Sequence, residues 1–222
     1  MKCLAVNTAN TVLSIALCDG KKTLYHFAAP EMRDQGGLLL GHVQKALAAA
    51  GIGYDGLDLM AVVTGPGSFT GIRIGLAAMR ALAMAADKPL IGLTSLDLFS
   101  VNDPAALNVV AVEAWREELY FQTAGEMPVN QSPAVFAQSL ANRDQPIVIS
   151  GDAAEKLAPF LPAARVIARP ADARDLAQKT IEIYARDGAV AAAQRPSPFY
   201  LRPADVTLSP ARNRSIEGRH KA

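Results

Sequence analysis

Histidine and cysteine are scarce in this chain of 222 residues, which has three of the first and two of the second. His26, His42 and His220 lie far apart, and the sequence holds neither a His-x-x-x-His nor a Cys-x-x-Cys pair. Zinc sites are usually built on such closely spaced pairs. We therefore expect no dedicated metal site. Cys3 and Cys18 are too few for a disulfide framework, which favours a reducing compartment.

An excess of charge of one sign and a long uninterrupted apolar run are also missing. The 22 basic and 21 acidic residues leave a net charge of +1, which gives no general attraction to nucleic acid or to anionic lipid. The N-terminal segment turns polar at Asn7, too early for the apolar region of a signal peptide. The most apolar helical pattern carries Arg73 and Arg80, so we expect no apolar run of membrane length. These absences predict a cytoplasmic protein without membrane contact.

Apolar residues and a regular order of elements are present. Half of the residues are apolar, enough for a large core. Short apolar stretches bounded by turn residues predict strands, and longer periodic stretches predict helices. In the first half the predicted strands are 2–7, 11–18, 22–27, 57–65 and 89–95, with helices at 35–50 and from the loop after residue 64 to residue 86. This order favours an α/β fold in which helices pack on a mixed sheet.

The second half repeats this order in a degraded form. Its predicted strands lie within 107–125, at 146–152 and at 164–168, and its predicted helices at 133–141, 153–161 and 172–187. We expect Asp172 and Gly188 to cap the last helix. The chain then divides into an N-terminal lobe, residues 1–102, a C-terminal lobe, residues 103–210, and a tail, residues 211–222. The tail contains Ile-Glu-Gly-Arg, a protease-cleavage sequence, so a cloning remnant and a native end both stay open.

A glycine-rich loop opens the most apolar helix, in the stretch TGPGSFTGIRIGLAAMRALA that begins at Thr64. It is neither a P-loop, because no lysine follows Gly71, nor a dinucleotide fingerprint. Amides at a helix N-terminus could still hold an anion near Ser68. Of Gly65 and Gly67, at least one should need a positive φ or lie against another backbone segment. The candidate anion or nucleotide loop consists of Asn7, Thr8, Gly65, Gly67, Ser68 and Gly71.

The two helices of the first half each have unlike faces. Helical spacing places small residues on the stripe that should face the sheet and a mixed stripe opposite it. In the helix after the loop, the first stripe holds Gly71, Gly75, Ala78 and Leu82, the second Arg73, Ala77, Arg80, Met84 and Asp87, and an apolar flank Ile72, Leu76 and Ala83. In the helix at 35–50, the expected buried stripe is Leu40, Val43 and Leu47, and Gly37, Gly41 and Ala48 form a smooth flank.

Two neighbouring helices with smooth apolar flanks suggest a helix–helix interface with another subunit. The alternative, that both helices are buried within an alanine-rich protein, stays open on the pattern alone. The candidate partner interface consists of Leu38, His42, Lys45, Ala49, Arg73, Leu76, Ala77, Arg80 and Met84.

Residues suited to catalysis are few. The sequence has no Gly-x-Ser-x-Gly elbow. Ser68 has no evident base partner and is interpreted as a helix cap or turn residue. Glu113 lies inside an apolar strand, where a charge needs a partner or an opening, so it is either a site residue or an edge-strand residue. We assign no catalytic residue.

Three stretches of the sequence resemble the bacterial TsaB (YeaZ) family. They are GPGSFTGIRIGLAAMRALA with the flanking LMAVVTG and PLIGLTSLDL, the opening CLAVNTANTVLSIAL, and the late PSPFYLRP. The similarity is close over residues 1–97 and loose after them. It implies the actin-like, Hsp70-like (ASKHA) fold of two lobes, each a mixed sheet with packed helices.

The resemblance also implies a function. Members of the family serve in forming threonylcarbamoyladenosine at position 37 of tRNA, as non-catalytic partners that activate or scaffold a paralogous catalytic subunit, TsaD. An ATPase, TsaE, is also involved. The resemblance implies no cofactor of the chain's own, with ATP or ADP at most at the shared complex. It further implies a homodimer of the lone chain and contact with tRNA only through the complex.

The chain departs from the family pattern at three places. Asn7 stands where the family usually has aspartate, Asp34–Gly37 where it often has histidine before Thr or Ser, and Glu113–Arg116 where it often has Asp-Ala-Arg. Each change weakens a polar position that nucleotide chemistry could use, and none touches the glycine-rich loop.

Two other functions stay open. One is an ATP-using transferase with its own site between the lobes, and the other is a protease, for which the sequence offers no nucleophile with partners. A basic cluster in the tail is interpreted as solvated rather than RNA-binding. It consists of Arg202, Arg212, Arg214 and Arg219.

Overall fold

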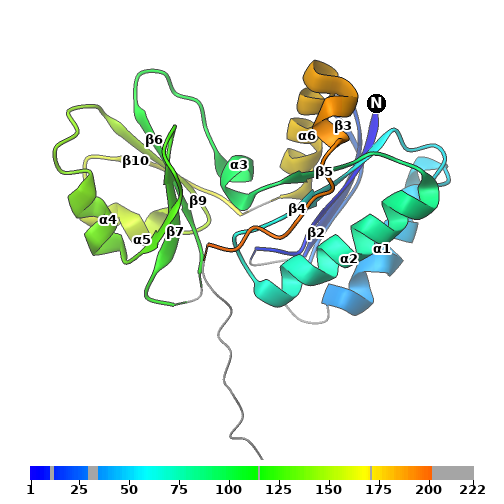
Figure 1. Cartoon of the computed structure of the whole chain (residues 1–222), viewed down its shortest axis with the longest axis horizontal. Coiled ribbons are helices and arrows are strands. Elements are labelled where there is room, and N and C mark those ends of the chain that lie inside the picture. The colour runs from blue at the N-terminus through cyan, green and yellow to red at the C-terminus, as the bar shows by residue number, and fades with distance from the viewer. Residues whose placement is uncertain (11–12, 30–34, 115, 171, 202–222) are drawn as a thin grey trace, which may run out of the picture.

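The computed structural model describes residues 1–10, 13–29, 35–114, 116–170 and 172–201. Within these ranges the chain forms two mixed sheets of five strands, which stand on the two sides of Figure 1 with helices packed against them. The predicted α/β fold of two lobes, each a mixed sheet with packed helices, is confirmed. The predictions made for Asp34, for Arg202 and for the tail fall outside the described residues.

The first sheet has the strand order β3-β2-β1-β4-β5. Its strands are β1 (Lys2–Asn7), β2 (Ser14–Asp19), β3 (Lys22–Ala28), β4 (Leu59–Val63) and β5 (Leu90–Leu93). The first three form an antiparallel meander, and β4 and β5 run parallel to β1. Every residue of β4 is buried, as expected for a strand whose residues are almost all apolar and which is covered on both faces.

The second sheet repeats this topology. Its order is β10-β9-β6-β7-β8, with β6, β7 and β8 antiparallel and β9 and β10 parallel to β6. Its strands are β6 (Leu107–Val112), β7 (Leu119–Thr123), β8 (Val129–Gln131), β9 (Ile147–Gly151) and β10 (Arg165–Ala168). The internal repeat is therefore confirmed. The sequence did not predict β8, because three residues are too few to show an alternating pattern.

Six α-helices join and cover these sheets in the described part of the chain. They are α1 (Gln35–Ala50), α2 (Phe69–Ala86), α3 (Ser95–Phe99), α4 (Pro133–Ser139), α5 (Ala154–Leu157) and α6 (Ala173–Asp187), with 3-10 turns η1 (Ala158–Phe160) and η2 (Gly188–Ala192). The single helix predicted at 153–161 is divided between α5 and η1, since Pro159 lacks the N–H that would continue the α-helix. Asp172 and Gly188 cap α6 as predicted.

The two halves of the chain exchange helices. α1 and α2 cover one face of the first sheet, while α6, from the second half, packs on the other face against β1 and β2 (Figure 1). Its first amide, that of Ala173, donates to Ser14 Oγ at 2.8 Å. In return α3 contacts β6 and β9 of the second sheet. The lobes in space thus differ from the segments 1–102 and 103–210, because α6 belongs to the first sheet although it comes late in the chain.

Candidate functional site

The glycine-rich loop between β4 and α2 is held against three other segments. Gly65 has a φ of +111°, and a Cβ there would lie 2.6 Å from the carbonyl oxygen of Phe199. At Gly67 a Cβ would lie 2.1 Å from the carbonyl oxygen of Ala9. The Gly65 carbonyl accepts a hydrogen bond from the Ser95 amide at 2.7 Å. The prediction that a glycine here needs positive φ or a close backbone neighbour is confirmed.

Several polar groups of this loop are hydrogen-bonded within the protein. The Ser68 amide donates to the carbonyl of Ala9 at 2.7 Å, and the Gly71 amide donates to Ser68 Oγ at 3.2 Å. Thr8, which is fully buried, donates its hydroxyl to the Gly71 carbonyl at 2.7 Å. The turn after β1 therefore occupies the place beneath the loop. Two of the amides that an anion would need, those of Ser68 and Gly71, already have partners within the protein.

A polar network links this turn to the second sheet. Asn7 accepts from the Ala9 amide and donates to Asn10 Oδ1 at 3.1 Å, and Asn10 Nδ2 reaches Asp152 Oδ2 at 3.5 Å. Asp152 in turn accepts the Glu113 amide at 2.9 Å. Asn7 stands where the family pattern has aspartate, and here its amide serves as an internal bond donor as well as an acceptor.

Glu113 and Asp152 place two carboxylates in this network. Glu113 lies one residue after the end of β6, not inside the strand as predicted, but it is buried and forms an ion pair with Lys156. Burial raises the pKa of Asp152 to about 6, and the charge of Glu113 adds to the rise. Asp152 was not predicted as a site residue, because a Gly-Asp pair after a strand is also an ordinary turn.

The outer faces of α1 and α2 carry most of the predicted partner residues. Lys45 and Ala49 are exposed on α1, and Arg73, Ala77 and Met84 are exposed on α2. Leu38 and Arg80 are half-buried. The predicted interface residues of the two helices are thus brought to one side of the first sheet, with two exceptions that lie inward.

Those exceptions are Leu76 and His42. Leu76 is 2% exposed in the main core, which removes it from the surface, because the sheet and its neighbours cover the flank that it shares with Ile72. His42 turns toward β3, where Phe27 stacks on its ring at 3.5 Å and Tyr25 Oη lies 2.6 Å from Nδ1. Burial, with the charge of Lys45, lowers the pKa of His42.

The buried stripe predicted for α1 was wrong at one position. Leu40 is 51% exposed, and Leu39 occupies the core at 1%. The core stripe consists of Leu39, Val43, Ala46 and Leu47. The predicted buried face was displaced by one residue at this end of the helix. Leu38, Leu39 and Leu40 are consecutive, so the sequence alone did not show which of them faces the core.

The segment Pro196–Leu201 lies along α2, and we call it the C-terminal strap. Phe199 donates its amide to the Thr64 carbonyl at 2.9 Å, and Arg80 Nε donates to the Pro196 carbonyl at 2.9 Å. Arg73 Nε donates to Tyr200 Oη at 3.3 Å. The sequence marked this stretch only as a resemblance. The structure shows that it fixes both arginines of the outer α2 stripe.

The described residues bear on two expectations, one about metal and one about a membrane-spanning helix. Among them, no group of three or more His, Cys, Asp and Glu side chains is arranged to hold a metal ion. α2 has the length and mean hydropathy of a membrane span, so the expectation that its arginines prevent this was too strong. Core helices of soluble proteins can have the same length and mean hydropathy. Ile72, Leu76 and Met79 of α2 are buried.

Sequence comparisons show which known proteins this chain is similar to. The sequence is 36% identical over 140 residues to the tRNA threonylcarbamoyladenosine biosynthesis protein TsaB of Haemophilus influenzae, covering 61% of this chain and 58% of that protein. It is 35% identical over 126 residues to the protein of the same name from Escherichia coli, covering 54% of each. The chain is similar to proteins of the TsaB (YeaZ) family.

The matches cover only part of the TsaB relatives, and a second family also matches. The chain spans a little over half the length of these two TsaB relatives. A Pseudomonas aeruginosa structure named YeaZ covers 90% of this chain at 24% identity with a TM-score of 0.69, which shows the shared fold. Residues 36–134 also match the TsaD family, tRNA N6-adenosine threonylcarbamoyltransferase. The matched residues include most of α1, the glycine-rich loop and α2.

The close contacts at the loop predict a stability effect. Gly67→Val and Gly65→Val should each lower the free energy of unfolding, by roughly 1–3 kcal/mol on the scale of backbone strain. The physical reason is that the new Cβ would lie only 2.6 Å (Gly65) or 2.1 Å (Gly67) from a backbone carbonyl oxygen, so backbone must shift. Gly41→Val is the matched control, because no atom lies within 4 Å of a Cβ there. Chemical denaturation curves for the three variants test this, and parent-like curves for both loop variants would contradict it.

The raised pKa of Asp152 predicts that the stability of the fold depends on pH. Its folded pKa of about 6 lies above the ordinary value of 3.8, so the ionised carboxylate costs stability at neutral pH. That cost disappears as the pH falls through about 6 toward 4, where the folded protein takes up the proton first. The melting temperature of Asp152→Asn relative to the parent should therefore be higher at pH 7 than at pH 4, whatever constant cost the lost acceptor for Asn10 Nδ2 adds. Asp144→Asn, at an exposed position, controls for removing a carboxylate. A constant difference across this range would refute the assignment.

Proposed function

We propose that this chain is a non-catalytic partner subunit of a paralogous threonylcarbamoyltransferase, TsaD, in forming threonylcarbamoyladenosine at position 37 of tRNA. The names of the two TsaB relatives support the pathway. The match of residues 36–134 to the TsaD family supports the paralogy between the two subunits. Paralogues that share a pair of helices can associate through those helices in a pseudo-symmetric way.

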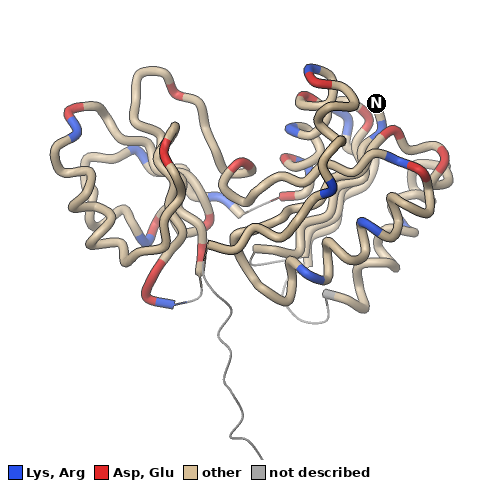
Figure 2. The backbone as a smooth tube through the Cα atoms, viewed as in Figure 1, with Lys and Arg blue, Asp and Glu red and all other residues tan. Residues whose placement is uncertain are grey.

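The observation that carries the proposal is the exposed face of α1 and α2. The two helices contact each other on one side of the first sheet, and their tubes in Figure 2 are mostly free of charge. Small residues are common at the exposed positions, and three large apolar side chains, Leu40, Phe69 and Met84, are exposed among them. The small residues on this face are Gly41, Ala48 and Ala49 on α1, and Ala77, Ala81 and Ala85 on α2. Such a face permits close approach of another helix pair.

The inward-facing loop supports a role without chemistry of the chain's own. Ser68 and Gly71 donate their amides internally, Asn7 replaces a carboxylate, and Glu113 is paired with Lys156. In this proposal the chain needs no cofactor, and ATP or ADP would bind at the shared complex. The proposal includes TsaE as a further partner and a homodimer of the lone chain. It also holds that the chain contacts tRNA only through the complex and works in the cytoplasm.

A second candidate function is an ATP-using transferase with a site between the lobes. The observation in its favour is Asp152, a half-buried carboxylate that faces Asn10 across the lobes with a raised pKa. A steady Mg²⁺-dependent ATPase of the purified chain, lost in Asp152→Ala and in Thr8→Ala, would favour this function over the first. We expect no such turnover.

Ala77→Trp tests the partner surface. Ala77 is exposed on α2, so the indole should leave the monomer folded and force the partner's helices away. Overpacking of ~1–3 kcal/mol corresponds to a loss of affinity for the catalytic paralogue of roughly ten- to a hundredfold. The measurement is a binding titration with the purified paralogue, together with thermal melting.

Ala185→Trp is the matched control, an exposed alanine on α6 at the opposite face of the same sheet. It should bind like the parent. Equal affinity of Ala77→Trp and the parent would place the interface elsewhere, and no binding by the parent chain would reject the proposed function itself.

A further inference from the structure

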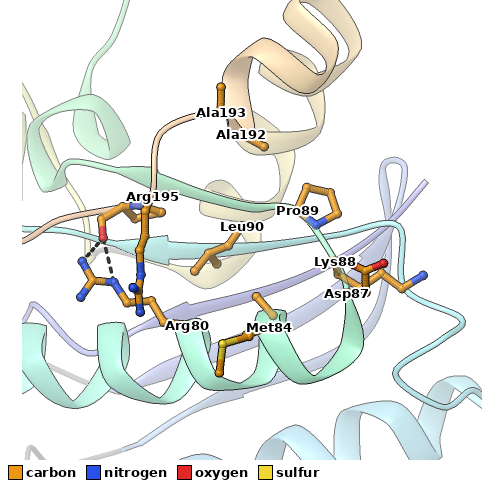
Figure 3. A pocket seen from close by; sticks show the side chains of 11 residues that line it. Arg80, Met84, Asp87, Lys88, Pro89, Leu90, Ala192, Ala193 and Arg195 are labelled. Carbon is orange, nitrogen blue, oxygen red and sulfur yellow. Dashed lines mark hydrogen bonds between the residues drawn. The ribbon is translucent and has the colours of Figure 1, made fainter.

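A groove of about 410 Å³ lies between α2 and the chain that leads into the C-terminal strap. One wall is the second half of α2, with Arg80 and Met84. Leu90 lies at the base, and Ala192 and Arg195 close the other side (Figure 3). A volume of this size holds several side chains of a partner. The groove lies beside the proposed partner face, because Arg80 and Met84 belong to both.

The charge of this groove is mostly positive. Arg80, Lys88 and Arg195 line it, against the single carboxylate of Asp87. Lys88 Nζ is held by the Asp55 carbonyl at 2.8 Å, and Arg80 by the Pro196 carbonyl, both neutral acceptors. Arg195 is exposed and has no carboxylate partner among the described residues. In Figure 3 its side chain extends from the strap side toward α2, beside Arg80.

Two guanidinium groups at one end of a groove, neither paired with a carboxylate in the described chain, form a receptor for an acidic group. The planar fork of an arginine matches a carboxylate in a bidentate geometry. The bond from Arg80 to the strap carbonyl fixes that side chain in advance, which lowers the entropy cost of binding. The neighbouring helices add no competing acid, since neither α1 nor α2 contains Asp or Glu.

The rest of the groove is mostly apolar, which favours an occupant with an apolar side chain over a nucleic acid. Met84 is 80% exposed, and Leu90 and Pro89 lie beside it, so an occupant gains by burying an apolar side chain here. No aromatic residue is among those that line the groove, so a nucleobase would find no stacking partner. Three cations and one acid are also too few for the many phosphate contacts that hold a nucleic-acid backbone.

We propose that this groove binds an acidic and apolar segment of the catalytic paralogue, with a carboxylate between Arg80 and Arg195 and an apolar side chain against Met84 and Leu90. The inference rests on the proposed function and deepens it. It makes the strap part of the recognition surface and assigns Arg195, which the sequence had not singled out, a role in choosing the partner.

The test compares Arg195→Glu with Arg186→Glu, each a reversal of one exposed arginine. Arg186 lies in the last turn of α6 and is not among the residues that line the groove. Affinity for the purified paralogue is measured by titration at low and at moderate salt. Arg195→Glu should weaken binding by roughly tenfold or more at low salt, because it places a like charge against the partner's carboxylate, and by less at moderate salt. Arg195→Lys should lie between it and the parent. Arg186→Glu should bind like the parent.

The outcomes separate this inference from the proposed function. If Ala77→Trp weakens the complex while Arg195→Glu binds as tightly as the parent, the groove is not a recognition site and the proposed function stands. If the parent chain forms no complex with its paralogue, both are rejected. If Arg195→Glu instead loosens a homodimer or lowers retention of tRNA by the lone chain, with the paralogue's affinity unchanged, another occupant holds the groove and the inference is overturned.

Discussion

The contact on which the first lobe depends is the close approach of the turn after β1 to the glycine-rich loop. Gly67 admits the carbonyl of Ala9, and Gly75 lies against the Thr8 hydroxyl, where a Cβ would meet the oxygen at 2.2 Å. A Cβ at either glycine would collide with the turn after β1 at the present spacing. At the same contact the Ser68 amide, which could have bound an anion, donates its hydrogen bond to the Ala9 carbonyl. One packing constraint thus both positions α2 and weakens the loop as a ligand site.

The position of α2 then determines what the surface offers. With Gly71 and Gly75 inward, the helix turns Ala77 and Met84 outward, and the strap arrives along its edge to hold Arg73 and Arg80. The arginines are therefore ordered before any partner binds. This arrangement links the glycine-rich loop, the outer face of α2 and the groove beside the strap into one surface, since the strap also bonds to Thr64 next to the loop.

Much of the fold followed from the sequence because its signals are local. The bounds of α1, the Asp172 and Gly188 caps and the buried β4 depend on periodicity and on single residues. What failed depends on contacts distant in the chain. Leu39 and Leu40 could not be told apart without the sheet, and Leu76 was assigned outward because its covering residues were unknown. α6 could not be placed on the first sheet, and neither Asp152 nor the strap could be given a role, because their partners lie far away in sequence.

The central claim, that this chain acts through the outer face of α1 and α2, can be tested on two methionines of nearly equal exposure. Met84 on α2 is 80% exposed and Met127, between β7 and β8, is 84% exposed. Peroxide converts exposed methionine to the sulfoxide at a rate that depends on access. The oxidation rates of both residues, followed by mass spectrometry with and without the paralogue, give the comparison. The account predicts that the paralogue slows oxidation of Met84 and leaves Met127 unchanged, and equal rates at Met84 in the free and complexed chain would contradict it.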